Sequence, residues 1–374
     1  MRTAGSVTTD DKTRTGGTVV AATVDAACVG LDPELLADIR THADALDRGR
    51  DTSRRSFPRL GAAGLLGLGA PGNRDGRLPR MAEIIGQISG ECMSTGFSVW
   101  AHRMAVEYLL TAATPFALAA AQPLLAGTAL GVTGMASAFK EAAGCGSLEL
   151  TAVRAGGGYR LTGSLRWASN LYPDSTMVTA ARTDSGERLI VALPLDTAGV
   201  VIGDHFDLLA MGSTASSYLK LNDAYIGADQ VLSADFDTFL QTVRPTFLVL
   251  QSAMCLGLTR TALDQSRLAL QGVNAVFAAE VDAVAAKLAG AQATLAQLSA
   301  AVGGTTSPTK KELLSLRLAA AELSSASADL EIRTAGGKGY ASRTPASRRY
   351  REAAFIPVQS PSEAQLRWEL GRCA

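Results

Sequence analysis

The sequence predicts an α+β protein with helical segments at both ends and a small β domain between them. Apolar residues recur at helical spacing in residues 31–46 and 81–125, and again in three long stretches, residues 246–272, 278–302 and 310–335. Between these two helical regions lie short runs of alternating or β-rich character, separated by Gly, Asp, Asn and Pro. The order of the elements defines this fold class.

The same patterns divide the chain into four parts. Residues 1–30 are polar and rich in Gly and Thr, which predicts a loose arm. We expect an N-terminal helical domain at 31–125, a small β domain with barrel-like or orthogonal sheets at 126–233, and a C-terminal four-helix bundle at 234–374. Three long amphipathic helices cannot pack as isolated surface elements, so the last part is expected to form a bundle.

Composition excludes several classes of function. Lys and Arg together number 35, as do Asp and Glu, so no net charge favours a nucleic-acid partner. No stretch approaches the roughly 20 consecutive apolar residues of a membrane-spanning helix, and we expect a cytoplasmic protein without a membrane partner. The five cysteines are scattered and form no C-x-x-C pair, so neither a disulfide framework nor a metal site is expected.

One motif is the run GGYRLTGSLRWASN, residues 157–170, which predicts a hairpin with a Trp near its end. It is similar to a hairpin of the acyl-CoA dehydrogenases, in which the Trp packs beside a flavin ring and the following Ser or Thr hydrogen-bonds the flavin. The resemblance therefore implies FAD as the cofactor, with Trp167 and Ser169 in these two roles.

A second motif, GGKGY at residues 336–340, follows a long helix and is itself followed by Arg348, Arg349 and Arg351. It resembles the family's Q-x-x-GG-x-GY signature, whose glycines contact the adenine half of FAD from a neighbouring subunit. Close glycines let a backbone approach a cofactor without side-chain interference. The resemblance implies that Gly336 and Gly337 bind FAD in a homodimer or homotetramer.

A third motif, GVTGMAS at residues 131–137, stands where relatives read V-T-E-P-x-x-GSD. The resemblance assigns Val132 and Thr133 to the flavin pyrimidine edge. Because the segment continues into KEAAGCGS, the serine on the pyrophosphate side is either Ser137 or Ser147. A further cofactor contact in relatives comes from an R-x-x-FG motif, and only Arg267 stands near its place in this chain.

The expected catalytic glutamate is missing. Relatives remove a weakly acidic α-proton with a carboxylate. An alignment without gaps puts Ser360 in that position, and a shift by one puts Gln359 there, with Glu363 as the nearest carboxylate. The second position at which relatives carry the glutamate, on the helix that begins the C-terminal domain, has no acid in residues 244–250.

A member of this family without the α-base can still remove a hydride from an alcohol or aldehyde hydrate. The C-terminal segment PVQSPSEAQLRWEL, residues 357–370, resembles that of the acyl-carrier-protein-linked dehydrogenases. These enzymes belong to hydroxymalonyl and methoxymalonyl extender-unit biosynthesis in ascomycin-type polyketide clusters. The resemblance implies FAD-dependent oxidation of a glyceryl-derived thioester on an acyl carrier protein, with Arg103 or Arg244 as a cation for the substrate. The alternatives are a two-component flavin monooxygenase, an ordinary acyl-CoA dehydrogenase with an unidentified base, and a non-redox carrier-binding module.

Overall fold

The computed structural model describes residues 30–373, so the arm expected at residues 1–30 lies, apart from Gly30, outside the described residues. The part that precedes the sheet is helical. It consists of α1 (Pro33–Asp47), η1 (Ser53–Ser56), α2 (Phe57–Ala62), α3 (Leu78–Glu91), α4 (Met93–Ala112) and α5 (Pro115–Leu125).

Local sequence signals explain where several helices begin. The Asp32 side chain accepts a hydrogen bond from the Glu34 backbone N–H at the start of α1, and Thr114 caps α5 in the same way through Ala117. A proline follows each of these caps, at a position where the missing N–H costs no helical hydrogen bond.

The β domain forms one mixed eight-stranded sheet. Its elements are β1 (Gly131–Gly134), α6 (Ala136–Ala142), β2 (Leu150–Ala155), β3 (Gly158–Ala168), β4 (Thr176–Thr183), β5 (Arg188–Pro194), β6 (Val200–Ile202), β7 (Ser217–Gly227), η2 (Ala228–Gln230) and β8 (Val231–Ser233). The strand order is β6-β7-β3-β2-β4-β5-β8, and β1 pairs in parallel with the first half of β4. Apolar side chains of β2, β3, β4, β5 and β7 form a core of their own within this domain.

Long helices make up the C-terminal part. They are α7 (Phe236–Leu268), η3 (Gly272–Phe277), α8 (Ala278–Ala301), α9 (Lys310–Ala335), α10 (Gly337–Tyr340), α11 (Pro345–Phe355) and α12 (Glu363–Leu370). A capping box between Thr309 and Glu312 begins α9, and Gly336, at a φ of 61°, ends it.

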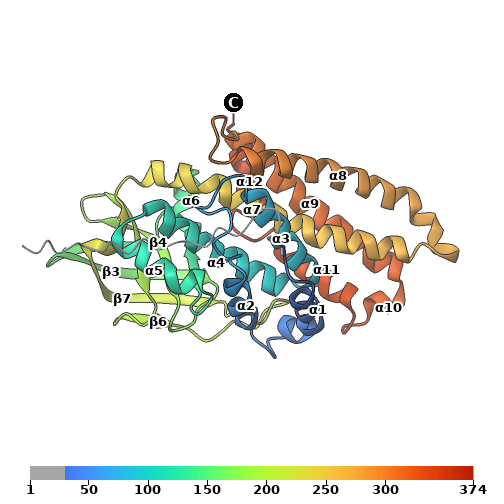
Figure 1. Ribbon diagram of the computed structural model, residues 1–374, viewed down its shortest axis with the longest axis horizontal. Coiled ribbons are helices and arrows are strands. Elements are labelled where there is room, and N and C mark those ends of the chain that lie inside the picture. The colour runs from blue at the N-terminus through green and yellow to red at the C-terminus, as the bar shows by residue number, and fades with distance from the viewer. Residues whose placement is uncertain (1–29, 374) are drawn as a thin grey trace, which may run out of the picture.

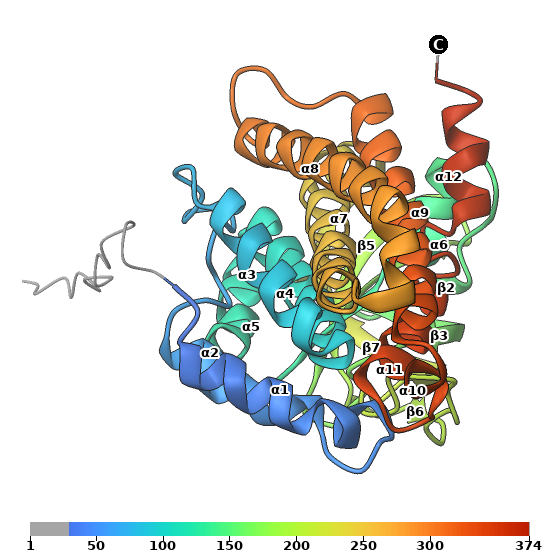
Figure 2. The ribbon, with the colours of Figure 1, turned by 90° about the vertical axis from the view of Figure 1, so that its right-hand side faces the viewer.

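Helix α7 is the centre of the helical core. It packs against α3, α4, α8 and α9, and Figure 2 shows α3 and α4 on one side of α7 and α9 on the other. The strands lie at one end of the molecule, whereas α8, α10 and α11 extend toward the other (Figure 1). Among the described residues, α7 alone is long and apolar enough to cross a membrane, a stretch that sequence analysis did not expect, but 89% of its apolar window is buried in the protein.

Two glycines set the distance between α3 and α7. A Cβ added to Gly257 would overlap the backbone carbonyl of Gly86, which belongs to the facing helix. Because a backbone carbonyl cannot move aside like the end of a flexible side chain, the two helices touch along their backbones at this crossing.

We therefore expect Gly257→Ala to lower the free energy of unfolding by about 3 kcal/mol or more, since overpacking against backbone forces the helices apart. Gly290→Ala is the matched control, because Gly290 also lies inside a helix but has open space where a Cβ would stand. Replacing it should stabilise the protein by about 0.5–1 kcal/mol. Urea denaturation measures both values, and equal effects of the two substitutions would contradict this account of the crossing.

Candidate active site

A cavity of about 370 Å³ lies where the β domain meets α4, α7 and the loop that follows α11. It contains residues from both ends of the chain and from the sheet between them. The lining residues are Phe97, Trp100, Ala101, Thr133, Ala136, Lys140, Trp167, Ala168, Ser169, Phe247, Phe355, Val358, Gln359 and Ser360.

Aromatic rings form the helical wall of this cavity. Phe97 stacks on Trp100 with ring centroids 5.6 Å apart and meets Phe355 edge-on at 5.0 Å. Trp100 meets Phe247 edge-on at 5.0 Å, and its indole N–H donates to the Phe247 carbonyl oxygen at 3.4 Å. A wall of interlocked rings keeps water from a bound group and leaves a flat apolar surface.

The sheet supplies the opposite wall. Trp167 is 54% exposed although its ring packs at a tilt of 35° against Phe206, so its indole offers a flat face to a ligand. Thr133 lies at 3.1 Å from the hydroxyl of the buried Tyr108, whose pKa is raised by burial, so the phenol stays neutral. Trp167 belongs to β3 and Thr133 to β1, so the sheet places a flat ring and a hydroxyl on one side of the cavity.

A chain of hydroxyl groups fixes what Ser169 offers to the cavity. The Thr214 hydroxyl donates to the Met211 carbonyl oxygen at 2.9 Å, so Ser216 must donate to Thr214 across 2.8 Å. Ser169 must then donate its single proton to Ser216 across 2.7 Å. Ser169 therefore faces the cavity as a hydrogen-bond acceptor, suited to an N–H group.

The remaining wall is the loop after α11. Gln359 and Ser360, the two alternatives for the position of the missing glutamate, both line the cavity. The buried Arg317 on α9 donates to the Ile356 carbonyl at 3.1 Å, and Gln251 on α7 donates to the Ser360 carbonyl at 2.9 Å. The loop is thus held against α7 and α9 by hydrogen bonds at both ends.

No carboxylate or imidazole is among the described residues that line the cavity. Glu363, the nearest carboxylate in sequence, begins α12 and pairs with Arg367 at 2.9 Å outside the cavity. The described lining therefore lacks the carboxylate that removes an α-proton in the relatives.

Arg103 and Arg244, the two cations expected to bind substrate, do not line the cavity. Arg103 is fully buried and donates to Glu107 at 2.9 Å, in a network that includes Arg74. Arg244 donates to Glu369 at 2.6 Å. Burial opposes the ionisation of Glu369, but Arg244 and Lys310 together hold its pKa below the ordinary value. Both arginines thus have their charges compensated within the fold.

The cation at the cavity is Lys140, which sequence analysis missed. It lies at the end of α6, is exposed, and has no ion pair recorded within residues 30–373. Its signal in the sequence was weak, because a single Lys in the KEAAGCGS stretch follows no pattern.

The other expected cofactor residues fall into two groups. Val132 is buried beside Thr133 in β1, and Ser137, next to the lining residue Ala136, has a buried hydroxyl without a hydrogen-bond partner. In contrast, Gly336 and Gly337 are exposed near α10, at the far end of the molecule from the sheet (Figure 1), and Arg267 is exposed and paired with Asp264. None of these three lines the cavity of its own chain.

His102 on α4 does not line the cavity but holds the start of β1 in place. Its Nδ1 accepts from the Gly131 backbone N–H at 3.0 Å, and its Nε2 lies 3.0 Å from the Leu124 carbonyl oxygen. Burial, reinforced by the charge of Arg103, lowers its pKa to about 3 against the effect of the Leu124 hydrogen bond. A neutral imidazole thus fixes the start of β1, which carries Thr133.

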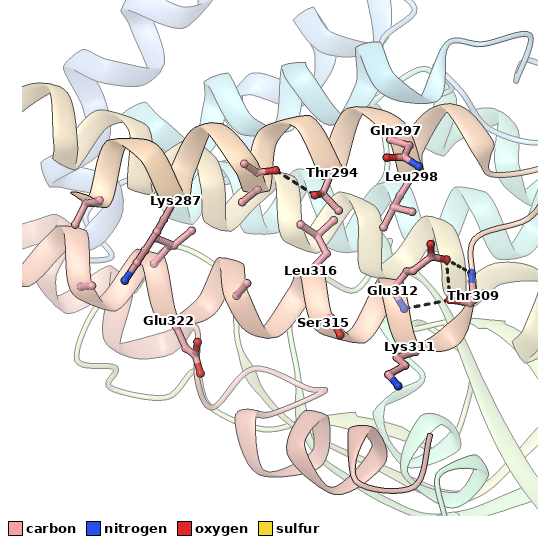
Figure 3. Close-up of a pocket in the computed structure, with 16 residues that line it drawn as sticks. Lys287, Thr294, Gln297, Leu298, Thr309, Lys311, Glu312, Ser315, Leu316 and Glu322 are labelled. Atoms are coloured by element: carbon pink, nitrogen blue, oxygen red, sulfur yellow. Dashed lines mark hydrogen bonds between the residues drawn. The ribbon is translucent and has the colours of Figure 1, made fainter. Parts of the chain in front are cut away.

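Two further hollows can be compared with this cavity. One of about 230 Å³ adjoins it and shares Phe97, Trp167, Phe355 and Val358 with it. A larger groove of about 880 Å³ runs between α8 and α9 (Figure 3), where the polar side chains include Lys287, Glu322 and the Thr309–Glu312 cap. The groove is open and contains none of the motif residues. The cavity of about 370 Å³ is therefore the candidate active site.

Comparison with known proteins shows which proteins the chain resembles. No family model matches the chain. It is 26% identical over 356 residues to the probable acyl-CoA dehydrogenase YngJ of Bacillus subtilis, covering 88% of this chain and 92% of that protein. It is also 28% identical over 237 residues to the human mitochondrial short-chain specific acyl-CoA dehydrogenase, covering 59% of this chain and 57% of that one.

Solved acyl-CoA dehydrogenases have the same fold as this chain. The butyryl-CoA dehydrogenase of Megasphaera elsdenii superposes with a TM-score of 0.80 at 15% identity, over 92% of this chain and 98% of that one. The chain has the acyl-CoA dehydrogenase fold. Two further structures share this fold. KijD3 in complex with FMN and a dTDP-amino sugar has a TM-score of 0.76 at 22% identity, over 94% of each chain. The prolyl acyl carrier protein oxidase AnaB has a TM-score of 0.75 at 17% identity, over 92% of this chain and 99% of that one.

The curated relatives are acyl-CoA dehydrogenases, and this similarity indicates a flavin-dependent oxidoreductase with FAD as its cofactor. The residues at the cavity fit a flavin. Trp167 offers a flat ring, Ser169 an acceptor for an N–H group, and Ser137 a buried hydroxyl without a partner.

We expect Trp167→Ala to weaken FAD binding about tenfold, because stacking on the indole contributes on the order of 1.4 kcal/mol. Trp368→Ala is the matched control, since Trp368 is 42% exposed on α12 and lies outside the cavity. Titration of each apoprotein with FAD measures the two affinities. Equal FAD affinity in the two variants would argue against this flavin site.

Proposed function

We propose that the protein is an FAD-dependent dehydrogenase that removes hydride from an oxygen-bearing carbon of a small acyl thioester. The substrate is a glyceryl-derived three-carbon unit on an acyl carrier protein, and the product is the hydroxymalonyl extender unit of polyketide biosynthesis. The ordinary α,β-desaturation of an acyl-CoA is not the reaction proposed.

The observation that carries this proposal is the composition of the cavity wall. Gln359 and Ser360 stand where a base is needed, and no described lining residue is a carboxylate. Desaturation requires loss of an α-proton, and therefore a positioned base. Oxidation of an aldehyde hydrate requires only that a C–H bond gives up its hydride while an O–H proton leaves to water, so it forms no carbanion.

The chain's own residues bind and orient the reactants. The aromatic wall of Phe97, Trp100 and Phe247 excludes bulk water, and the sheet side holds the flavin through Trp167, Ser169 and Thr133. When bound there, FAD supplies the two-electron acceptor. Gln359 and Ser360 face the acyl group from the loop after α11.

Two observations support an acyl carrier protein as the partner: one structural neighbour and one side chain at the cavity. AnaB, which shares the fold, is a prolyl acyl carrier protein oxidase. At the cavity, the exposed Lys140 offers a cation to the phosphate of a phosphopantetheine arm. The arginine cluster after α10 is less suited to docking, because Arg348 and Arg349 are buried beside Glu352 and Glu331.

We also propose a homodimer or homotetramer in the cytoplasm. Gly336, Gly337 and Arg267 are exposed and remote from the cavity of their own chain. They can serve as FAD contacts only if they reach the flavin of another copy. The relatives do not favour the monooxygenase alternative.

Anaerobic reduction of the flavin tests the proposal. Purified holoenzyme should lose its yellow colour with the carrier-bound three-carbon aldehyde, and should react at least about 100-fold more slowly with butyryl-CoA, because no base assists the latter. Faster flavin reduction by butyryl-CoA than by the carrier-bound aldehyde would contradict the proposal and indicate ordinary α,β-desaturation. Absence of reduction by either thioester would refute dehydrogenase activity.

A further inference from the structure

Arg317 is a buried cation without a carboxylate partner among residues 30–373. It is fully buried on α9, and its hydrogen bonds go to the side-chain oxygen of Gln251 at 3.0 Å, to the Ile356 carbonyl at 3.1 Å and to the side-chain oxygen of Gln359 at 3.5 Å. Its Nη1 has no partner. All three acceptors are neutral, so the positive charge is not compensated by the residues in contact with it.

This guanidinium lies 3.5 Å from Gln359 Oε1, a long hydrogen bond that favours one orientation of the Gln359 amide. Arginine can only donate hydrogen bonds, so Gln359 must turn Oε1 toward Arg317 and Nε2 away from it. Gln359 is 5% exposed and lines the cavity, and its Nε2 has no hydrogen-bond partner among residues 30–373. A buried amide donor without a partner is therefore held in the cavity wall.

Ser360 adds a second unpaired group at the same place. Its hydroxyl is buried without a partner and it also lines the cavity. Its backbone is fixed by Gln251, which accepts from Arg317 through Oε1 and donates to the Ser360 carbonyl through Nε2. One arginine thus positions both residues, directly and through a second glutamine.

We propose that Gln359 Nε2 and Ser360 Oγ form an oxygen-binding subsite, oriented by Arg317, that selects acyl groups with a carboxylate or its hydrated-aldehyde precursor at the far end. Two unpaired polar groups suit an oxygen that accepts hydrogen bonds, and the uncompensated guanidinium behind them favours an anion. No described lining residue carries a negative charge that would repel it. This inference rests on the proposed function and names the substrate class of that site.

A pair of ligands of matched shape tests the subsite. Malonyl-pantetheine and 3-methylbutyryl-pantetheine differ mainly in a carboxylate against an isopropyl group. Each is titrated anaerobically into FAD-loaded enzyme, and binding is measured as perturbation of the flavin absorption spectrum. The wild-type protein should bind the malonyl thioester at least about tenfold more tightly.

Three variants isolate the residues. Gln359→Leu should bring the two dissociation constants within about threefold of each other without changing that of the 3-methylbutyryl thioester. Gln359→Glu should reverse the preference, because two carboxylates would face each other. Arg317→Lys retains the charge, but its compact ammonium cannot reach Gln251, Ile356 and Gln359 as the planar guanidinium does, so as a positioning change it should reduce the preference while the FAD spectrum is retained.

Gln365→Leu is the matched control. Gln365 is another buried glutamine, on α12, and lies outside the cavity, so its loss should leave the preference unchanged. If Gln359→Leu weakened both thioesters equally, the amide would bind their common carbonyl and the subsite would be refuted. If neither thioester perturbed the flavin of the wild-type protein, the proposed function would fail together with the subsite.

Discussion

The hydrogen bonds of Arg317 hold together the part of the protein on which the candidate chemistry depends. This one guanidinium connects α9 to α7 through Gln251 and to the loop after α11 through Ile356 and Gln359. The loop forms one wall of the cavity, α7 carries Phe247 in another, and the sheet closes the third side. Because a buried cation is costly unless its donors are satisfied, the loop and α9 are constrained to remain together.

The resulting cavity differs from an α-proton-abstracting site in chemistry rather than in architecture. The fold places a flat indole, an oriented hydroxyl chain and an aromatic wall around a space next to Gln359 and Ser360. What it leaves out, within the described lining, is a carboxylate or an imidazole. A glutamate beside Arg317 would form a buried ion pair, whereas glutamine leaves the guanidinium free to act on a ligand.

Sequence reasoning predicted the elements whose signals are local. Helix α9 occupies the predicted residues 310–335, because apolar periodicity runs through the helix and a capping box begins it. The sequence did not identify β1, β2 and β8 as strands, although β1 lies within the motif at residues 131–137, since three to six residues carry too little periodicity and depend on pairing with distant strands. Trp167, Ser169 and Gln359 could be selected by motif, and all three line the cavity.

Residues whose role depends on tertiary partners could not be predicted. Arg244 was a plausible substrate cation by residue type, but Glu369, which neutralises it, comes from another helix 125 positions away. Arg103 pairs with Glu107 one turn along α4, but its complete burial depends on the fold. Arg317 lies 42 positions before Gln359, in a helix with no special motif, and Thr214 and Ser216 orient Ser169 from the loop that precedes β7. Only the fold brings these residues together.

The absence of a base can be measured without any net oxidation. Butyryl-CoA is incubated anaerobically with the FAD-loaded protein in D₂O, and exchange of its α-protons is followed by NMR. The structure predicts exchange no faster than in buffer alone, because no side-chain carboxylate or imidazole in the described lining can accept the proton. Exchange catalysed by the protein would contradict the account, since it would require a base at the cavity.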